Sequence, residues 1–247
     1  MCTKVATPGY DQLMYSFDTG GEGQTQVFDD VEPYFHYWHA DGFTRPWLPF
    51  TASETPSTVS SARWKLIPGM VQNEAAADAY ANTLNARAED VFVRASYRPY
   101  VRQYRGLLWV KGFYEPHRTG ARTVVPHFIQ AISGEPFTLG CIYNNWTDKD
   151  TGITSRTFTI ITTPPNKLLA EIHNEGQRMP LIIPPLQRRD WLQPLTDQQI
   201  SDIMQPLPDG FLKAHPVSGL VYDRSKGINN NQPQAQEEVQ MQKDLFS

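Results

Sequence analysis

Five short runs of aromatic and β-branched residues, separated by turn-forming residues, limit the folds open to this chain. They are RGLLWVKGFYE (105–115), PHFIQAI (126–132), PFTLGCIYNNW (136–146), TFTIITT (157–163) and the weaker FLKAHPVSGLVYD (211–223). This content predicts β-strands, joined mainly in antiparallel fashion. The 20 prolines and 16 glycines add many turns and argue against an all-helical protein.

Helices are expected to be few and short. Residues 74–84 follow Asn73, and residues 167–173 follow Asn166, in each case a suitable N-cap. Thr196 and Gln199 have the spacing of a capping box at the start of a third helix. Because these helices do not alternate regularly with the strands, the pattern favours an α+β fold over a parallel doubly wound sheet.

The chain divides into one globular region and a polar end. Residues 1–225 are expected to form a single domain, and residues 226–247, rich in Asn and Gln, a disordered tail. No apolar run approaches the roughly 18 residues of a membrane span, and the N-terminus lacks the basic-then-apolar pattern of a signal peptide. We therefore expect a cytoplasmic protein.

The net charge of −4 argues against a protein that coats DNA through bulk positive charge. It leaves room for a local basic groove, because five arginines interleave with three tyrosines between residues 85 and 115. These are Arg87, Arg94, Arg98, Arg102 and Arg105, with Tyr97, Tyr100 and Tyr104.

The two cysteines have different prospects. Two thiols cannot form a disulfide framework and fit a reducing compartment. Cys141 lies in a predicted buried strand and is expected to be inert. With no CxxC or HExxH motif, no metal or cofactor is expected.

Cys2 becomes the terminal residue if Met1 is removed, which aminopeptidase trimming favours when the second side chain is small. The terminus then carries an α-amine with a pKa of roughly 7.7–8.0, beside a thiol. The amine can attack an aldehyde to form a Schiff base, and the thiol can close onto the imine carbon as a thiazolidine. A ring-opened abasic site in DNA offers such an aldehyde. A chance cysteine at position 2 is the plain alternative.

Three further segments place one reactive side chain each beside apolar structure. Asn85 begins NARAE, Glu115 ends GFYE at a strand end, and His173 ends the helix that follows TTPPN. A carboxyl group between aromatic residues is placed for a raised pKa and for acid or base work, and a histidine can do likewise. Taken singly, each has a structural alternative: a turn residue, a solvated strand end and a helix cap.

Together these segments resemble the SRAP family, the SOS response-associated peptidases. The resemblance runs from Met1 to about Asp223 through MC, GFTRPWLP, WKLIP, NARAE, GFYE, TT-x-x-N, H…RMP and HPVSGLV, in that order. It implies a distorted barrel-like core of antiparallel strands flanked by short helices. It also implies a protein that links covalently to abasic sites in single-stranded DNA and shields the lesion.

Carried over by motif, the resemblance assigns catalytic roles to four residues. Cys2 supplies the amine and the thiol, Asn85 orients the amine, Glu115 shuttles protons, and His173 protonates or steadies the sugar oxygen. Met1 is removed either by the protein itself or by an aminopeptidase.

The resemblance also implies DNA contacts. Lys4, Arg87 and Arg178 are expected at phosphates, with Met179 next to Arg178, and Trp64 is expected to stack on a base, with core packing as its alternative.

Several positions depart from the usual family pattern. Thr3 and Lys4 replace Gly-Arg after Cys2, Lys65 replaces a glycine, and Gly69-Met70 lacks a second tryptophan. Pro116 follows GFYE where tryptophan is usual. Four residues instead of one separate His173 from Arg178, which places the geometry around His173 in question.

The last six residues, QKDLFS (242–247), resemble the short peptide by which bacterial proteins dock on the sliding clamp; a solvated tail is the alternative. We expect a monomer.

Two other functions remain open at this point. A cysteine peptidase or amidase would cleave an external amide with turnover. A non-covalent binder of single-stranded DNA would show salt-sensitive binding that survives Cys2→Ala.

Overall fold

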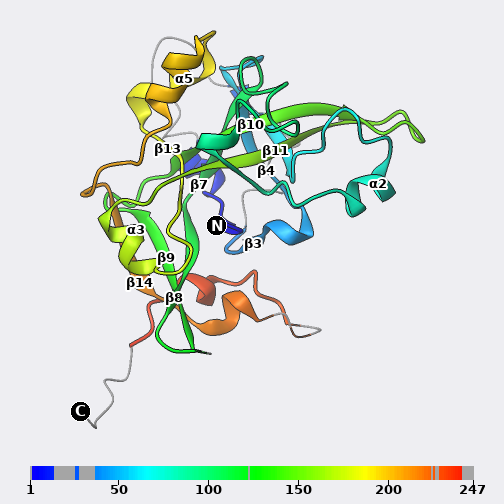
Figure 1. Ribbon diagram of the computed structural model, residues 1–247. Coiled ribbons are helices and arrows are strands. Elements are labelled where there is room, and N and C mark those ends of the chain that lie inside the picture. Colours follow the sequence, from blue (N-terminus) through cyan, green and yellow to red (C-terminus); the bar gives the residue numbers. More distant parts are fainter. Residues whose placement is uncertain are drawn as a thin grey trace.

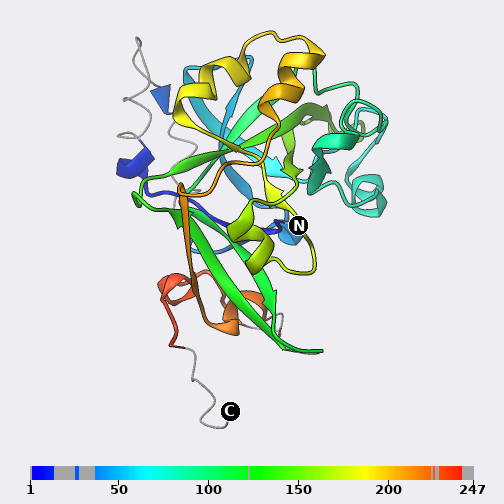
Figure 2. The same ribbon diagram turned by 60° about the vertical axis from the view of Figure 1, so that its left-hand side comes forward.

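The computed structural model describes residues 2–13, 26–27, 37–121, 123–223, 225 and 228–240, with the backbone alone at 26–27 (Figure 1). Two sheets dominate it, and short helices lie around them. Figure 2 shows α4 and α5 at one end of the molecule, and the C-terminal segment 228–240 at the other, beside β8 and β9.

Five strands close into a barrel in the order β11-β10-β7-β4-β5, and β5 returns to β11. Thr157 pairs with Arg63 and Phe158 with Trp64 across this closing, parallel contact. The barrel strands are β4 (Trp47–Ala52), β5 (Thr58–Trp64), β7 (Arg105–Val110), β10 (Phe137–Thr147) and β11 (Thr154–Thr163). Four short strands extend this sheet: β2 (Gln26–Val27), β6 (Asn85–Arg87), β12 (Met179–Pro180) and β13 (Ile182–Ile183).

The second sheet is wholly antiparallel and has the order β14-β9-β8-β1-β3. Its strands are β1 (Lys4–Ala6), β3 (Ala40–Asp41), β8 (Gly112–Arg118), β9 (Val124–Ala131) and β14 (Leu212–Pro216). Strand β1 lies between β8 and β3, and Cys2, two residues before β1, is buried.

The main core lies between the barrel and this second sheet. It contains Phe50, Trp64, Phe113, Phe137 and Phe158, all at most 1% exposed. Successive residues of barrel strands β7, β10 and β11 alternate between this core and a second one, so these strands are buried on both faces. The expectation of an α+β fold with a distorted, mainly antiparallel barrel and short helices is confirmed.

The helices begin where their caps predict. Asn73 Oδ1 accepts from Ala76 N at the start of α2 (Glu74–Ala79), and Asn166 Oδ1 from Leu169 N at α3 (Lys167–Ile172). The capping box of Thr196 and Gln199 opens α5 (Asp197–Ile203). A further helix and five 3₁₀ turns complete the described elements: α4 (Arg188–Leu192), η2 (Gly42–Thr44), η3 (Ala88–Asp90), η4 (Pro185–Gln187), η5 (Gly219–Tyr222) and η6 (Pro233–Gln236).

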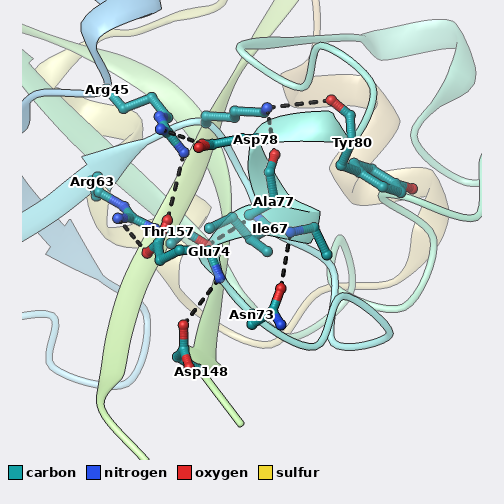
Figure 3. Close-up of polar contacts among 12 residues, drawn as sticks. Arg45, Arg63, Ile67, Asn73, Glu74, Ala77, Asp78, Tyr80, Asp148 and Thr157 are labelled. Atoms are coloured by element: carbon teal, nitrogen blue, oxygen red, sulfur yellow. Dashed lines mark hydrogen bonds and ion pairs between the residues drawn. The ribbon is translucent and has the colours of Figure 1, made fainter. Parts of the chain in front are cut away.

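Helix α2 is fixed to the barrel by charged contacts (Figure 3). Arg63 donates to Glu74 at 2.7 Å, and Asp148 accepts from Glu74 N at 3.0 Å. Lys65 Nζ donates to the carbonyls of Ala77 and Tyr80 near the helix end. Lys65 has a φ of 95°, a left-handed conformation that favours the glycine usual in the family.

Three predicted boundaries were wrong. The run 105–115 is two strands in different sheets, β7 and β8, which separate at Lys111. The helix predicted over 74–84 ends at Ala79, and the strand predicted over 211–223 covers only Leu212–Pro216.

The disorder predicted for residues 226–247 was wrong for 228–240. Ala235 is fully buried, and Gln236 Nε2 donates to the carbonyl of Trp38. Asn231 Oδ1 accepts from the backbone N–H groups of Trp38 and His39. Polar side chains therefore fix this segment to the domain. The clamp-like peptide 242–247 lies outside the described residues.

Among the described residues, no helix is both long and apolar enough to cross a bilayer. In the same part of the chain, no group of three or more His, Cys, Asp or Glu side chains is arranged to hold a metal ion.

Candidate active site

The four residues predicted to be catalytic reach one region from four elements. Cys2 lies two residues before β1, Asn85 begins β6, Glu115 lies in β8, and His173 caps the C-terminal end of α3. Strands β1 and β8 are antiparallel neighbours, with Val5 opposite Phe113. Continuing this register places Glu115 level with Thr3, beside Cys2.

Asn85 contacts Cys2 directly. Its Nδ2 donates to the Cys2 carbonyl oxygen at 2.8 Å. Its Oδ1 is buried and has no hydrogen-bond partner within the described residues. A buried acceptor without a donor is costly, so this oxygen is suited to a donor that arrives at the N-terminus.

Glu115 is a buried carboxyl group with an altered pKa. Its side chain is 1% exposed, and burial raises its pKa to about 7. Its Oε2 lies 3.6 Å from His173 Nδ1. At neutral pH, Glu115 therefore exists in both protonation states, as a residue that gives and takes protons requires.

His173 is held in one orientation. Its Nδ1 lies 2.9 Å from the carbonyl oxygen of Arg178, which can only accept, so Nδ1 carries the hydrogen. Burial lowers the pKa of His173, which favours the neutral ring, with Nε2 as an acceptor. A Cβ at Gly176 would lie 1.9 Å from Nε2, so glycine lets the chain pass close to the ring. The hydrogen bond thus brings Arg178 back to His173 across the four residues that separate them in sequence.

The Cys2 thiol is 1% exposed. Burial raises its pKa well above the ordinary range, and the negative charge of Glu115 adds to this effect. The side chain is consequently a protonated thiol at neutral pH. Its nucleophilic use would require a neighbouring base.

Trp64 corrects the stacking prediction. Its side chain is fully buried, stacks on Phe158 with ring centroids 6.2 Å apart, and donates from Nε1 to the Leu84 carbonyl at 3.0 Å. A nucleobase cannot reach this ring without opening the core, so core packing is its role.

Three residues predicted to contact DNA make contacts within the protein in this structure. Lys4 is 1% exposed, and its Nζ forms an ion pair with Asp41 Oδ2 at 2.6 Å. Arg178 donates to both carboxylate oxygens of Glu89, at 2.8 and 2.9 Å. Met179 is buried at 1%. Lys4 and Arg178 are thus paired with carboxylates of the protein, and Met179 is packed in its core.

The arginine-rich stretch contributes less basic surface than its sequence indicates. Arg105 is buried and donates to the backbone carbonyls of Trp191, Val101, Arg102 and Gln193. Arg102 forms a bidentate pair with Asp197, and Arg94 is paired with Asp90. Arg87 is exposed at the end of β6.

Two residues near the site were not singled out from the sequence. One is Asp41, whose carboxylate forms the ion pair with Lys4. The Tyr222 ring lies 5.3 Å from Lys4 Nζ, and burial, followed by the charges of Glu115 and Cys2, raises its pKa above the usual range. Tyr222 directly follows the HPVSGLV motif, but no local pattern shows that it folds back to the N-terminus.

Fold and site together define a class: α+β proteins with a closed five-stranded barrel and a cysteine at position 2 near amide, carboxyl and imidazole groups. The chain belongs to the SRAP family, since the family model described as SOS response associated peptidase matches residues 1–224.

Curated relatives support this assignment. The chain is 32% identical over 174 residues to the abasic site processing protein YoqW of Bacillus subtilis (strain 168), a match that covers 70% of this chain and 73% of that protein. It is 30% identical over 161 residues to the abasic site processing protein YoaM of the same organism, with 64% and 68% covered.

Solved structures share the fold. A crystal structure of a protein from Bacteroides thetaiotaomicron has a TM-score of 0.83 and 28% identity, covering 97% of this chain and 100% of that one. A protein from Bordetella bronchiseptica has a TM-score of 0.73 at 20% identity, covering 88% and 100%, which speaks for the fold alone.

Proposed function

We propose that this protein processes abasic sites by forming a thiazolidine between Cys2 and the ring-opened sugar in single-stranded DNA. The observation that carries the proposal is the meeting of Asn85, Glu115 and His173 at Cys2. The names of the curated relatives, abasic site processing proteins, point to the same lesion.

The reaction begins once Met1 has been removed. The α-amine of Cys2 attacks the aldehyde carbon of the open sugar and gives a carbinolamine, which loses water to form an imine. The thiol sulfur then bonds to the imine carbon, and its proton ends on the nitrogen. One water leaves in total, and no oxidant or reductant is needed.

Glu115 fits both proton transfers of this sequence. Its protonated form can help the carbinolamine hydroxyl leave, and the resulting carboxylate can take the proton of the Cys2 thiol. A pKa of about 7 lets one group serve in both roles near neutral pH. A base is required, because burial keeps the thiol protonated.

Asn85 and His173 act by orientation. Asn85 Oδ1, the buried acceptor at the N-terminus, accepts a hydrogen bond from the Cys2 amine and aims its lone pair. His173, neutral and with Nε2 as acceptor, steadies a hydroxyl of the open sugar.

The thiol environment disfavours a cysteine peptidase that acts on external substrates. Such enzymes depend on a thiolate with a lowered pKa. Here burial and Glu115 shift the pKa of Cys2 upward. A reaction in which the amine attacks first and the thiol second is compatible with a thiol whose pKa is raised. Removal of Met1, by this site or by an aminopeptidase, precedes either chemistry.

The experiment mixes purified protein with a single-stranded oligonucleotide bearing one abasic site, followed by a denaturing gel and intact-mass analysis. We expect an adduct whose mass equals protein without Met1 plus oligonucleotide minus one water. Cys2→Ala should give no stable adduct, and Cys141→Ala, which alters the other buried thiol, should give a normal one.

Borohydride separates the two chemical steps. Cys2→Ala keeps an α-amine, so reduction should trap its imine with the DNA although no thiazolidine forms. If a protein whose mass proves a free Cys2 terminus forms no adduct, the proposal fails and a non-covalent binder remains. Turnover of an amide substrate would favour the peptidase instead.

A further inference from the structure

An exposed aromatic residue, Phe43, lies in the turn whose first residue, Gly42, is hydrogen-bonded to Thr3, the residue after the candidate nucleophile. Phe43 is 53% exposed and belongs to η2, which directly follows β3. In the β1–β3 pair, Val5 is opposite Ala40 and Lys4 opposite Asp41, and Gly42 N donates to Thr3 O at 2.8 Å. Strand β3 ends at Asp41, and the hydrogen bond from Gly42 to Thr3 places the start of η2 beside the residue that follows Cys2.

The strand of Cys2 and the turn of Phe43 are joined by one carboxylate. Asp41 Oδ1 accepts from Phe43 N at 3.0 Å and caps η2. Asp41 Oδ2 accepts from Lys4 Nζ at 2.6 Å, two residues after Cys2. Because Lys4 is buried, this ion pair is well shielded from solvent and holds the turn to β1.

The other end of the turn is fixed to α2. Arg45 is left-handed, with a φ of 54°, and its N–H donates to the Gly42 carbonyl. Its guanidinium forms ion pairs with Asp78 and Glu74, and Figure 3 shows it directed at this helix. Contacts on both sides of Phe43 therefore fix the backbone that carries it.

Trp64 supports the same turn from below. A Cβ at Gly42 would lie 3.1 Å from the Trp64 ring, so the turn rests on the face of the indole. The tryptophan predicted to meet DNA thus packs against the turn at Gly42, the residue before Phe43.

We propose that Phe43 stacks on the nucleobase adjacent to the abasic site and so positions the lesion at Cys2. This deepens the proposed function and rests on it. An aromatic face accepts any base, which suits a protein that must act at a lesion in any sequence. A ring whose backbone is already fixed loses little conformational freedom when a base stacks on it.

The test measures the rate of adduct formation against the concentration of abasic single-stranded DNA. Phe43→Ala should raise the half-saturating concentration about tenfold, in line with the loss of one base–aromatic contact, and leave the limiting rate within about twofold. Phe43→Trp should behave like the parent. Phe43→Leu, which keeps apolar bulk without an aromatic face, should resemble Phe43→Ala. Leu186→Ala, at a residue 94% exposed in η4, serves as the control and should change nothing.

A second arm removes the base instead of the ring. A tetrahydrofuran spacer, which has neither base nor aldehyde, replaces the nucleotide on one side of the abasic site and then on the other. One of the two replacements should raise the half-saturating DNA concentration of the parent protein as much as the Phe43→Ala substitution does. The same replacement should not raise the half-saturating concentration of the Phe43→Ala variant any further. The proposal would be overturned if the parent and the Phe43→Ala variant had equal half-saturating concentrations. It would also be overturned if the effects of the spacer and of the substitution were additive. A parent protein that forms no adduct at all would instead refute the proposed function.

Discussion

At the scale of single residues, Glu115 shows how the site reduces stability. The buried carboxyl group has a pKa of about 7, against roughly 4.3 when unfolded. Between these values the unfolded chain has lost the proton that the native state keeps, so the free energy of unfolding falls as pH rises. Below pH 4 both states are protonated, and the penalty disappears.

Glu115→Gln should therefore stabilise the protein above pH 7 by roughly 2–4 kcal/mol, while slowing adduct formation. The two proteins should converge in stability near pH 4. Urea unfolding across this pH range measures the difference, with Glu171→Gln as a control at an exposed glutamate of α3. A difference independent of pH would contradict the assigned ionisation.

Arg87 and Arg178 were both predicted to contact phosphate, but their substitution should affect the salt dependence of DNA affinity differently. Arg87→Ala should lower the slope of log affinity against log salt by about one, the loss of one phosphate contact. Arg178→Ala should leave that slope unchanged and cost about 1–3 kcal/mol of stability, because Arg178 is bound to Glu89 and Thr162. Fluorescence anisotropy in a salt series and thermal melting distinguish them. Equal salt slopes for the two variants would show that Arg178 does reach phosphate.

The residues that meet at Cys2 could be selected from sequence because each lies in a recognisable motif. The partners of the basic residues could not. Lys4 is paired with Asp41, and Arg178 with Glu89, across long stretches of chain. Their sequence neighbours give no sign of this. Trp64 illustrates the same limit, since its burial depends on the pairing of β5 with β11.

At the scale of elements, the loop after α3 holds the His173 ring in its position. Four residues separate His173 from Arg178, and the loop returns so that the Arg178 carbonyl meets His173 Nδ1. Gly176 lies against the imidazole, where a Cβ would come within 1.9 Å of Nε2.

Gly176→Ala should therefore push the imidazole from its position and slow adduct formation, by about 100-fold if the shift approaches 1 Å. Gly219→Ala is the matched control, because a Cβ there meets nothing within 4 Å. Single-turnover kinetics with abasic DNA measure the effect. An unchanged rate would show that the ring can move without loss, or that His173 takes no part.

Strand prediction succeeded where the aromatic and β-branched pattern was dense, as in β10 and β11. It failed for β4 and β5, whose sequences WLPFTA and TVSSARW contain a proline and two serines. Both strands are held by neighbours from the barrel. The division of 105–115 into β7 and β8 is likewise a tertiary effect, since Lys111 N donates to Ala6 O of the second sheet.

At the scale of the whole molecule, the C-terminal segment 228–240 packs against the chain that leads into β3. Strand β3 in turn pairs with the strand that follows Cys2. Val217 bridges to Glu238, and Val239 N donates to Pro216 O, so the segment also follows β14. A stretch that composition marks as disordered is thus held beside the second sheet, because its side-chain amides pair with backbone groups and one isolated bridge joins it to Val217.

A chain that ends at residue 227 should melt about 4–8 °C lower than the parent, corresponding to the loss of about 2 kcal/mol. It gives up the burial of Ala235 and the hydrogen bonds of Asn231 and Gln236 to Trp38 and His39. A chain that ends at residue 240 keeps each of these contacts and should melt like the parent. Asn231→Ala, which removes one acceptor of two backbone N–H groups, should show part of the loss. Differential scanning calorimetry of the four proteins at one pH makes the comparison. Identical melting of the two truncated chains would show that segment 228–240 adds nothing to stability, as the polar composition alone predicts.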